Sequence, residues 1–143
     1  MTDHVAAIST TVEKTNRILS EIEKAMGWRD RPDQALSALR VVLHTLRDRL
    51  PVNEAAHMGA QLPELVRGIY YEGWEPSRVP VKMNREEFLD EIRRHFIYAG
   101  GAEFDIEQMA GVVLETVCLH LDHGEVEKIK AALPHSIAAL FPE

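Results

Sequence analysis

The chain has 143 residues and a formal net charge of −7, with 45% hydrophobic and 27% charged residues. This balance is typical of a globular protein, and the length fits one domain or two small domains in close contact. The acidic excess lies in the second half, where residues 73–143 carry 13 acidic against seven basic side chains. Such an excess opposes binding to phosphate backbones and anionic lipids, so we expect no nucleic acid and no membrane partner.

Cysteine usage and hydropathy indicate the compartment. Cys118 is the only cysteine, so no disulfide can form within the chain. No run of about 18 apolar residues could span a membrane, and the first residues lack the basic patch and apolar core of a signal peptide. These features favour a reducing cytoplasm as the location.

The first predicted helix carries an apolar stripe with alternating steps of three and four residues, from Val5 to Met26. Gly27 is a natural stop, because glycine adopts the left-handed conformation at helix ends, and Thr2 or Asp3 can cap the start. A heptad stripe of this length is typical of a core-facing helix, and the alternative is a seam for self-association.

Three further helices complete the first half. Asp30 and Asp33 are predicted to cap a helix whose leucines repeat from Leu36 to Leu50, and Pro51 ends it. A short helix over 52–61 follows, and Pro63 is predicted to begin another, since proline suits the first helical position.

The second half begins after a linker at residues 73–83, whose Gly and Pro residues do not belong in a helix interior. Gly100 and Gly101 are predicted to break its first helix, and Pro134 to start its last. Three pairs have the spacing of a capping box: Asn84 with Glu87, Asp105 with Gln108, and Asp122 with Glu125.

Residues 41–70 recur at 112–141, with an offset of 71 residues and no gap. Nine of the first 23 aligned pairs are identical, among them Glu54 with Glu125. The duplication predicts an all-α bundle of two tandem four-helix repeats, residues 1–72 and 84–143, related by a pseudo-twofold axis and packed as one compact domain. The repeat is longer than the 20–50 residues of solenoid proteins, which favours a shared core.

Several strings along the chain are specific enough to suggest a family. LRDRLP is followed by EAA, then by QLPELVRGIYYEGW, and after the linker by KM and REEFL. In these strings the chain resembles the bacterial family known as domain of unknown function 2267. The resemblance implies a duplicated all-helical protein and carries over no catalytic residues.

Two groups of residues raise the question of a metal. Glu54 and His57 have the Glu-x-x-His spacing of di-iron bundles, which requires the motif on two helices. The duplicate has Lys128 in place of the histidine, so we interpret Glu54 and His57 as an exposed pair on a short helix. We therefore expect no metal and no cofactor there.

The second group is Cys118, His120 and His123. Cys118 and His120 point about 200° apart on a helix and cannot share one ion, and two histidines fall short of a structural zinc site. We interpret Cys118 as a small buried side chain and the histidines as residues of a helix's last turn. No catalytic constellation emerges elsewhere; His135 and Ser136, for example, are adjacent and point apart on a helix.

The best candidate for an interaction surface is the corner formed by Arg67, Tyr71 and Trp74, because such residue types are enriched at protein interfaces. The alternative is that Trp74 fills the gap between the repeats. The sequence thus favours a non-catalytic helical module that contacts a protein partner or a second copy. Alternatives are a small-molecule binder with a pocket walled by Trp28 and Trp74 between the repeats, a nucleic-acid-associated protein, or a cryptic enzyme.

Overall fold

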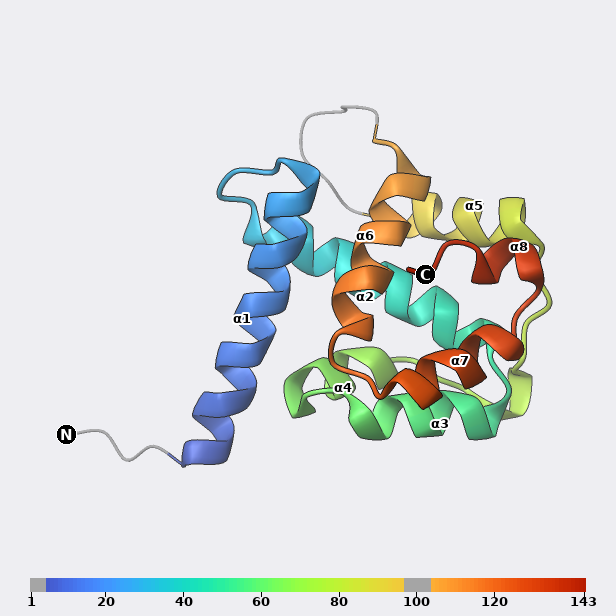
Figure 1. Cartoon of the computed structure of the whole chain (residues 1–143), viewed down its shortest axis with the longest axis horizontal. Coiled ribbons are helices and arrows are strands. Elements are labelled where there is room, and N and C mark those ends of the chain that lie inside the picture. Colours follow the sequence, from blue (N-terminus) through green and yellow to red (C-terminus); the bar gives the residue numbers. More distant parts are fainter. Residues whose placement is uncertain (1–4, 97–103) are drawn as a thin grey trace.

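A computed structural model describes residues 5–96 and 104–143, and within these ranges the chain is all helical (Figure 1). The all-α class predicted from the sequence is confirmed. The elements are α1 (Ala6–Met26), α2 (Pro32–Arg49), α3 (Val52–Gln61), α4 (Glu64–Tyr71), the short 3₁₀ helix η1 (Pro76–Arg78), α5 (Arg85–His95), α6 (Ile106–Cys118), α7 (His123–Ala131) and α8 (His135–Ala138).

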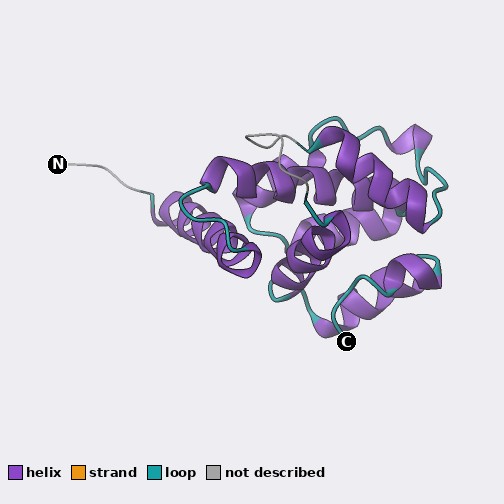
Figure 2. Ribbon diagram, turned by 90° about the horizontal axis from the view of Figure 1, so that it is seen from above, coloured by secondary structure: helices purple, strands orange, loops and turns teal. Residues whose placement is uncertain are grey.

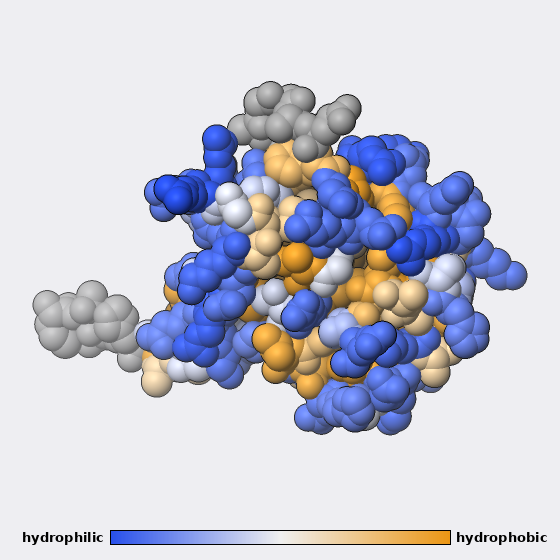
Figure 3. Space-filling view, turned by 45° about the horizontal axis from the view of Figure 1, so that its top comes forward, coloured by the Kyte–Doolittle hydropathy of each residue, from blue (hydrophilic) through white to orange (hydrophobic). Residues whose placement is uncertain are grey.

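The core is built around α2, which contacts α1, α4, α5 and α6. Its leucine seam is fully buried from Leu39 onward, where Leu39, Leu43, Leu46 and Leu50 have no exposed surface, and Leu36 is half-buried. Charged and polar side chains cover most of the face seen in Figure 3, with apolar side chains visible between them. None of the helices in the described part of the chain is long and apolar enough to cross a membrane.

Each half consists of two longer helices followed by two shorter ones. The lengths are 21, 18, 10 and 8 residues for α1 to α4, and 11, 13, 9 and 4 residues for α5 to α8. Short loops join most neighbouring helices (Figure 2). This order follows the predicted repeat, whereas the pseudo-twofold relation and the domain boundaries stay predictions.

Local sequence signals set several helix ends. Gly27 ends α1 with φ 71°, in the left-handed region that glycine reaches without strain. Asn84 and Glu87 form the complete reciprocal capping box at the start of α5, and Asp105 accepts a hydrogen bond from the Gln108 amide. The expected caps Thr2 and Asp3 and the expected break at Gly100 and Gly101 lie outside the described residues.

Two of the predicted caps are wrong. Arg31 is the N-cap residue of α2 and makes no side-chain capping bond; the Glu23 carboxylate of α1 accepts its amide proton at 2.7 Å instead. At the start of α7, Asp122 makes no side-chain capping bond either. The Glu125 side chain is turned into the contact between α7 and α3, so it is not in the reciprocal position.

The stripe of α1 is only half covered. Thr15, Ile18, Leu19 and Ile22 are buried, as a core-facing helix requires. Val5, Ile8 and Val12, on the same stripe, are 62%, 61% and 41% exposed. In Figure 1 α1 lies at the left edge of the molecule, and its N-terminal half meets the rest of the chain at the start of α4, where the Leu65 amide donates to Thr11 Oγ1. The core-facing prediction therefore holds for the second half of the helix and not for the first.

Candidate functional site

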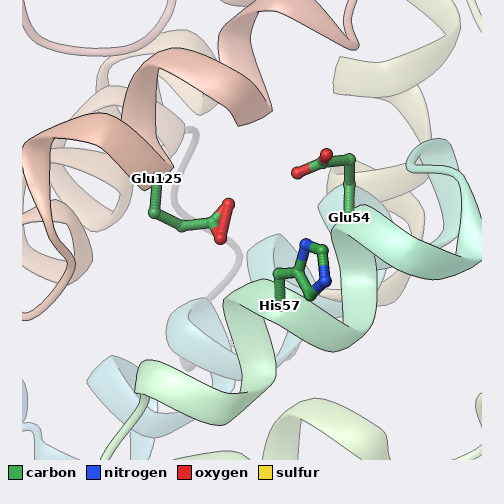
Figure 4. A group of neighbouring side chains, drawn as sticks. All are labelled: Glu54, His57 and Glu125. Atoms are coloured by element: carbon green, nitrogen blue, oxygen red, sulfur yellow. The ribbon is translucent and has the colours of Figure 1, made fainter.

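A cluster of three ionisable side chains joins α3 to α7. Glu54 and His57 lie three residues apart on α3 and so share one face of that helix, and Glu125 reaches toward them from α7 (Figure 4). One oxygen from each carboxylate and one imidazole nitrogen lie within 4.8 Å of one another. The expectation of an isolated exposed pair was wrong: His57 is exposed, Glu54 is half-buried, and a third residue joins them.

Packing between equivalent helices of the two halves creates this cluster. Met58 of α3 and Ile129 of α7 are both buried and occupy matching positions at the offset of 71 residues. Glu54 and Glu125 match in the same way, so the contact places two equivalent glutamates opposite each other. The Asp122 amide also donates to Gln61 Oε1 at 2.7 Å, which fixes the start of α7 against the end of α3.

The carboxylates are poorly satisfied by the protein. Glu125 is only 7% exposed, and the Oε2 atoms of Glu54 and Glu125 are buried without a hydrogen-bond partner. Leaving one buried polar atom unsatisfied costs about 1–3 kcal/mol, and more if it is charged. Burial raises the pKa of Glu125, and the nearby Glu54 raises it further, whereas His57 and Lys128 act in the opposite direction.

A buried tyrosine lies near this cluster. Tyr70 of α4 donates from its hydroxyl to Ala55 O at 2.7 Å. Burial, the largest cause, raises the pKa of Tyr70, and the Glu125 charge adds to the effect. The phenol therefore stays protonated and serves as a fixed donor to α3.

The other metal candidates do not converge. Within residues 5–96 and 104–143, only Glu54, His57 and Glu125 form a group of three or more possible ligands. Burial raises the pKa of the Cys118 thiol to about 11, which leaves it inert at neutral pH. Burial lowers the pKa of His120, and Lys14 and Arg17 lower it further.

The predicted interaction corner is largely occupied by internal contacts. Arg67 donates to the carbonyls of Gly59, Ala60 and Leu62 at 2.8, 3.0 and 3.1 Å, so it caps the C-terminal end of α3. The other two residues of this corner, Tyr71 and Trp74, are half-buried. A role for this corner in binding a partner stays a prediction.

Tyr71 lies directly over Gly59. A Cβ atom at Gly59 would be 2.6 Å from Tyr71 Cζ, so only glycine fits beneath this ring. The Trp74 ring packs on Tyr71 with centroids 5.3 Å apart, and its indole Nε1 is buried without a partner. The aromatic pair thus fastens the start of the linker to α3 and α4.

A groove of about 780 Å³ lies between α2, the linker and α5, and sequence reasoning did not locate it. His44 Nε2 contacts Ile69 O at 2.7 Å, and burial lowers the pKa of His44. Because a carbonyl oxygen can only accept, the Nε2 atom of His44 carries a proton in this contact. Arg40 pairs with Glu72 at 2.9 Å on the same wall. A usable signal was the spacing of Arg40, His44 and Arg47, which places them on one face of α2 beside the linker.

The walls of this groove differ from those predicted, since neither Trp28 nor Trp74 lines it. Trp28 instead stacks on Phe96 and meets Phe104 edge to face, with centroids 5.9 and 5.5 Å apart. The linker is held at both ends on α2: Arg47 Nη1 donates to Glu72 O at 2.6 Å, and the Val81 amide donates to Asp48 O at 2.7 Å.

Fold and site together define a small all-helical protein with a carboxylate–imidazole cluster between its halves. The chain belongs to the family described as uncharacterized conserved protein (DUF2267), whose model matches residues 15–140. The family resemblance seen in the sequence is thereby confirmed. No curated protein matches the chain.

Proposed function

We propose that this protein is a non-catalytic helical module that acts through protein contacts, by pairing with a second copy through the N-terminal half of α1. The observation that carries this proposal is the exposure of Val5, Ile8 and Val12, at 62%, 61% and 41%. When a heptad stripe is buried at one end of a helix and exposed at the other, the exposed end can pack against a partner helix.

A second copy fits the charge around this stripe. The chain carries −7 overall, so two copies repel each other over most of their surfaces. The first turn of α1 has no acidic residue. Residues 6–12 are all neutral, and Glu13 and Lys14, which follow Val12, carry opposite charges. Identical copies can therefore approach at this place, and the same patch serves both partners of a twofold dimer.

The size of the patch sets the expected affinity. Val5 to Val12 span about 10 Å of helix at about 1.5 Å per residue. Leu65, which is 43% exposed, adjoins the stripe because its amide donates to Thr11 Oγ1 at 2.9 Å. This area falls well below the roughly 1,600 Å² of a standard interface, so we expect a dissociation constant of micromolar order or weaker.

Sedimentation of the full chain over a concentration series tests the pairing. The wild type should shift from monomer to dimer, and Ile8→Glu should stay monomeric because it places a charge in the seam. Val81→Glu is the matched control, since Val81 is a 43% exposed apolar residue in the linker. A wild type that is monomeric at all concentrations, or a dimer that survives Ile8→Glu, overturns the proposal.

A photo-crosslinker at position 12 identifies what covers the stripe. A crosslink to a second copy supports self-pairing. A crosslink only to a different protein overturns it in favour of a heterologous partner helix.

The groove between α2 and α5 supports a second candidate function, binding of a polar small molecule. Its volume of about 780 Å³ falls in the range of about 300–1,000 Å³ that ligand sites occupy. Arg40, Lys82 and Arg94 line it together with acidic side chains. A thermal-shift screen should find a metabolite that raises Tm, and Arg94→Glu should remove this rise. Metabolites that raise the Tm of wild type and Arg94→Glu equally would argue against binding in the groove.

We also propose that the two halves are related by a pseudo-twofold axis. The pairing of helices supports it, because α2 contacts α6 and α3 contacts α7. A twofold axis would exchange α1 with α5 and α2 with α6. The contact between α1 and α6 then has an equivalent between α5 and α2, and both contacts are present.

A further inference from the structure

We propose that Glu54, His57 and Glu125 bind a divalent transition cation of the Zn²⁺ or Mn²⁺ class, which links α3 to α7. This site is independent of the proposed self-pairing, which uses the N-terminal half of α1 and none of these three residues.

The spacing of the ligand atoms suits one ion. Three atoms that are each 4.8 Å apart at most place their common centre no more than about 2.8 Å from each of them. Zinc is bound at about 2.0–2.2 Å by oxygen and nitrogen ligands. Small rotations of three side chains close this gap without moving either helix.

The second observation is the state of Glu125 itself. Glu125 is only 7% exposed, and its side chain points into the cluster (Figure 4). Its Oε2 atom has no hydrogen-bond partner. The Oε2 atom of Glu54, on α3, is likewise buried without a hydrogen-bond partner. When both glutamates are ionised, neither oxygen has a donor, and a cation between the two carboxylates would serve both. Native proteins leave few such atoms unsatisfied.

The ligand set selects the metal. Two carboxylates alone would suit Mg²⁺, Ca²⁺ or Mn²⁺, and an imidazole shifts the preference toward Zn²⁺, Co²⁺ or Fe²⁺. Because His57 is exposed, solvent reaches the site and water can complete the coordination. Three protein ligands with an open position are typical of accessible zinc sites.

Charge favours a cation and limits its affinity. Lys128, three residues after Glu125 on α7, lies close enough to influence that carboxyl electrostatically. Its positive charge partly neutralises the two glutamates, so we expect weaker binding than at a closed four-ligand site. Lys128 also occupies the position equivalent to His57, which explains why only one histidine is present.

Calorimetric titration of the untagged full chain with Zn²⁺, after treatment with a chelator, tests the site. We expect one ion per chain and a rise in Tm of roughly 5–10 °C at a free Zn²⁺ concentration 100 times Kd. Glu125→Gln and His57→Asn should each weaken Zn²⁺ binding at least about tenfold. His123→Asn is the matched control, since His123 is an exposed histidine at the start of the same helix α7.

The variants keep the test decisive. Glu125→Gln has nearly the same shape and removes a buried charge, and His57→Asn changes an exposed side chain, so neither should unfold the protein. No binding of Zn²⁺ or Mn²⁺ overturns the proposal. Binding that survives both variants, or that His123→Asn removes, overturns it as well, because the ion would then lie elsewhere.

Discussion

Replacing Arg47 by methionine should lower the free energy of unfolding by about 3–5 kcal/mol. Arg47 is 3% exposed and reaches from α2 to the end of α4. Its Nη1 donates to Tyr70 O at 2.8 Å and to Glu72 O at 2.6 Å, and its Nε donates to Asp48 Oδ1 at 2.9 Å. One guanidinium thus serves three acceptors in two segments.

The magnitude follows from these three bonds. Hydrogen bonds to a charged group contribute about 1.5–3 kcal/mol each. The bond to Asp48 counts for little, because that carboxylate is 36% exposed and water replaces the arginine. The bonds to the two carbonyls account for the loss, and methionine retains most of the packing of the aliphatic stem.

Urea denaturation monitored by circular dichroism measures this change. Arg47→Lys keeps the charge but cannot reach three acceptors at once, so its loss should be smaller, about 1–3 kcal/mol. Arg78→Met is the control, because Arg78 is 74% exposed and lies 3.7 Å from Glu75, and it should cost less than about 0.5 kcal/mol. A loss for Arg47→Met below 1 kcal/mol, or equal to the control, would refute the reasoning.

Two further predictions concern packing and pH. Gly59→Ala should destabilise the protein by about 1–3 kcal/mol, because its Cβ would collide with the Tyr71 ring. Gly68→Ala, on α4 with nothing within 4 Å of its Cβ, should instead stabilise by about 0.5–1 kcal/mol; equal effects in urea would contradict this. Because burial lowers the pKa of His44, the unfolded chain binds more protons, and stability should fall as pH drops from about 6.5 through the folded pKa. His44→Gln should flatten this dependence in thermal melts at pH 5 to 8, and an unchanged slope would exclude His44 as its source.

Features set by neighbours in the sequence could be predicted. Gly27 ends a helix because of its own backbone freedom, and Asn84 caps one because Glu87 is three residues away. Asp30 is not the cap, because α2 begins one residue later with Arg31 at the N-cap position, and a distant side chain, that of Glu23, accepts the Arg31 amide proton. The side chains that complete or replace a local signal lie elsewhere in the chain, so the sequence alone does not reveal them.

The cluster of Glu54, His57 and Glu125 shows what the duplication could have revealed. Lys128, at the position equivalent to His57, suggested that the motif is lost in the second half, but the offset of the repeat also indicates which residues are equivalent in space. If a twofold axis relates two equivalent helices that are in contact, equivalent residues near that contact face each other in space. That rule would have paired Glu54 with Glu125 from the offset of 71 residues.

Arg67 illustrates a different limit. Its residue type and its aromatic neighbours are those of an interface. The sequence cannot show that its guanidinium already binds three carbonyls at and just beyond the C-terminal end of α3. Helix ends leave carbonyls without partners, and a long cationic side chain within reach is the usual solution.

The anchoring of the linker has a mechanical consequence. Glu72 and Val81 are both bound to the same turn of α2, through Arg47 and the Asp48 carbonyl. A segment tied at both ends to one rigid helix closes on itself and cannot act as a hinge. The two halves should therefore move as a single body, and any molecule that enters the groove must fit a preformed shape.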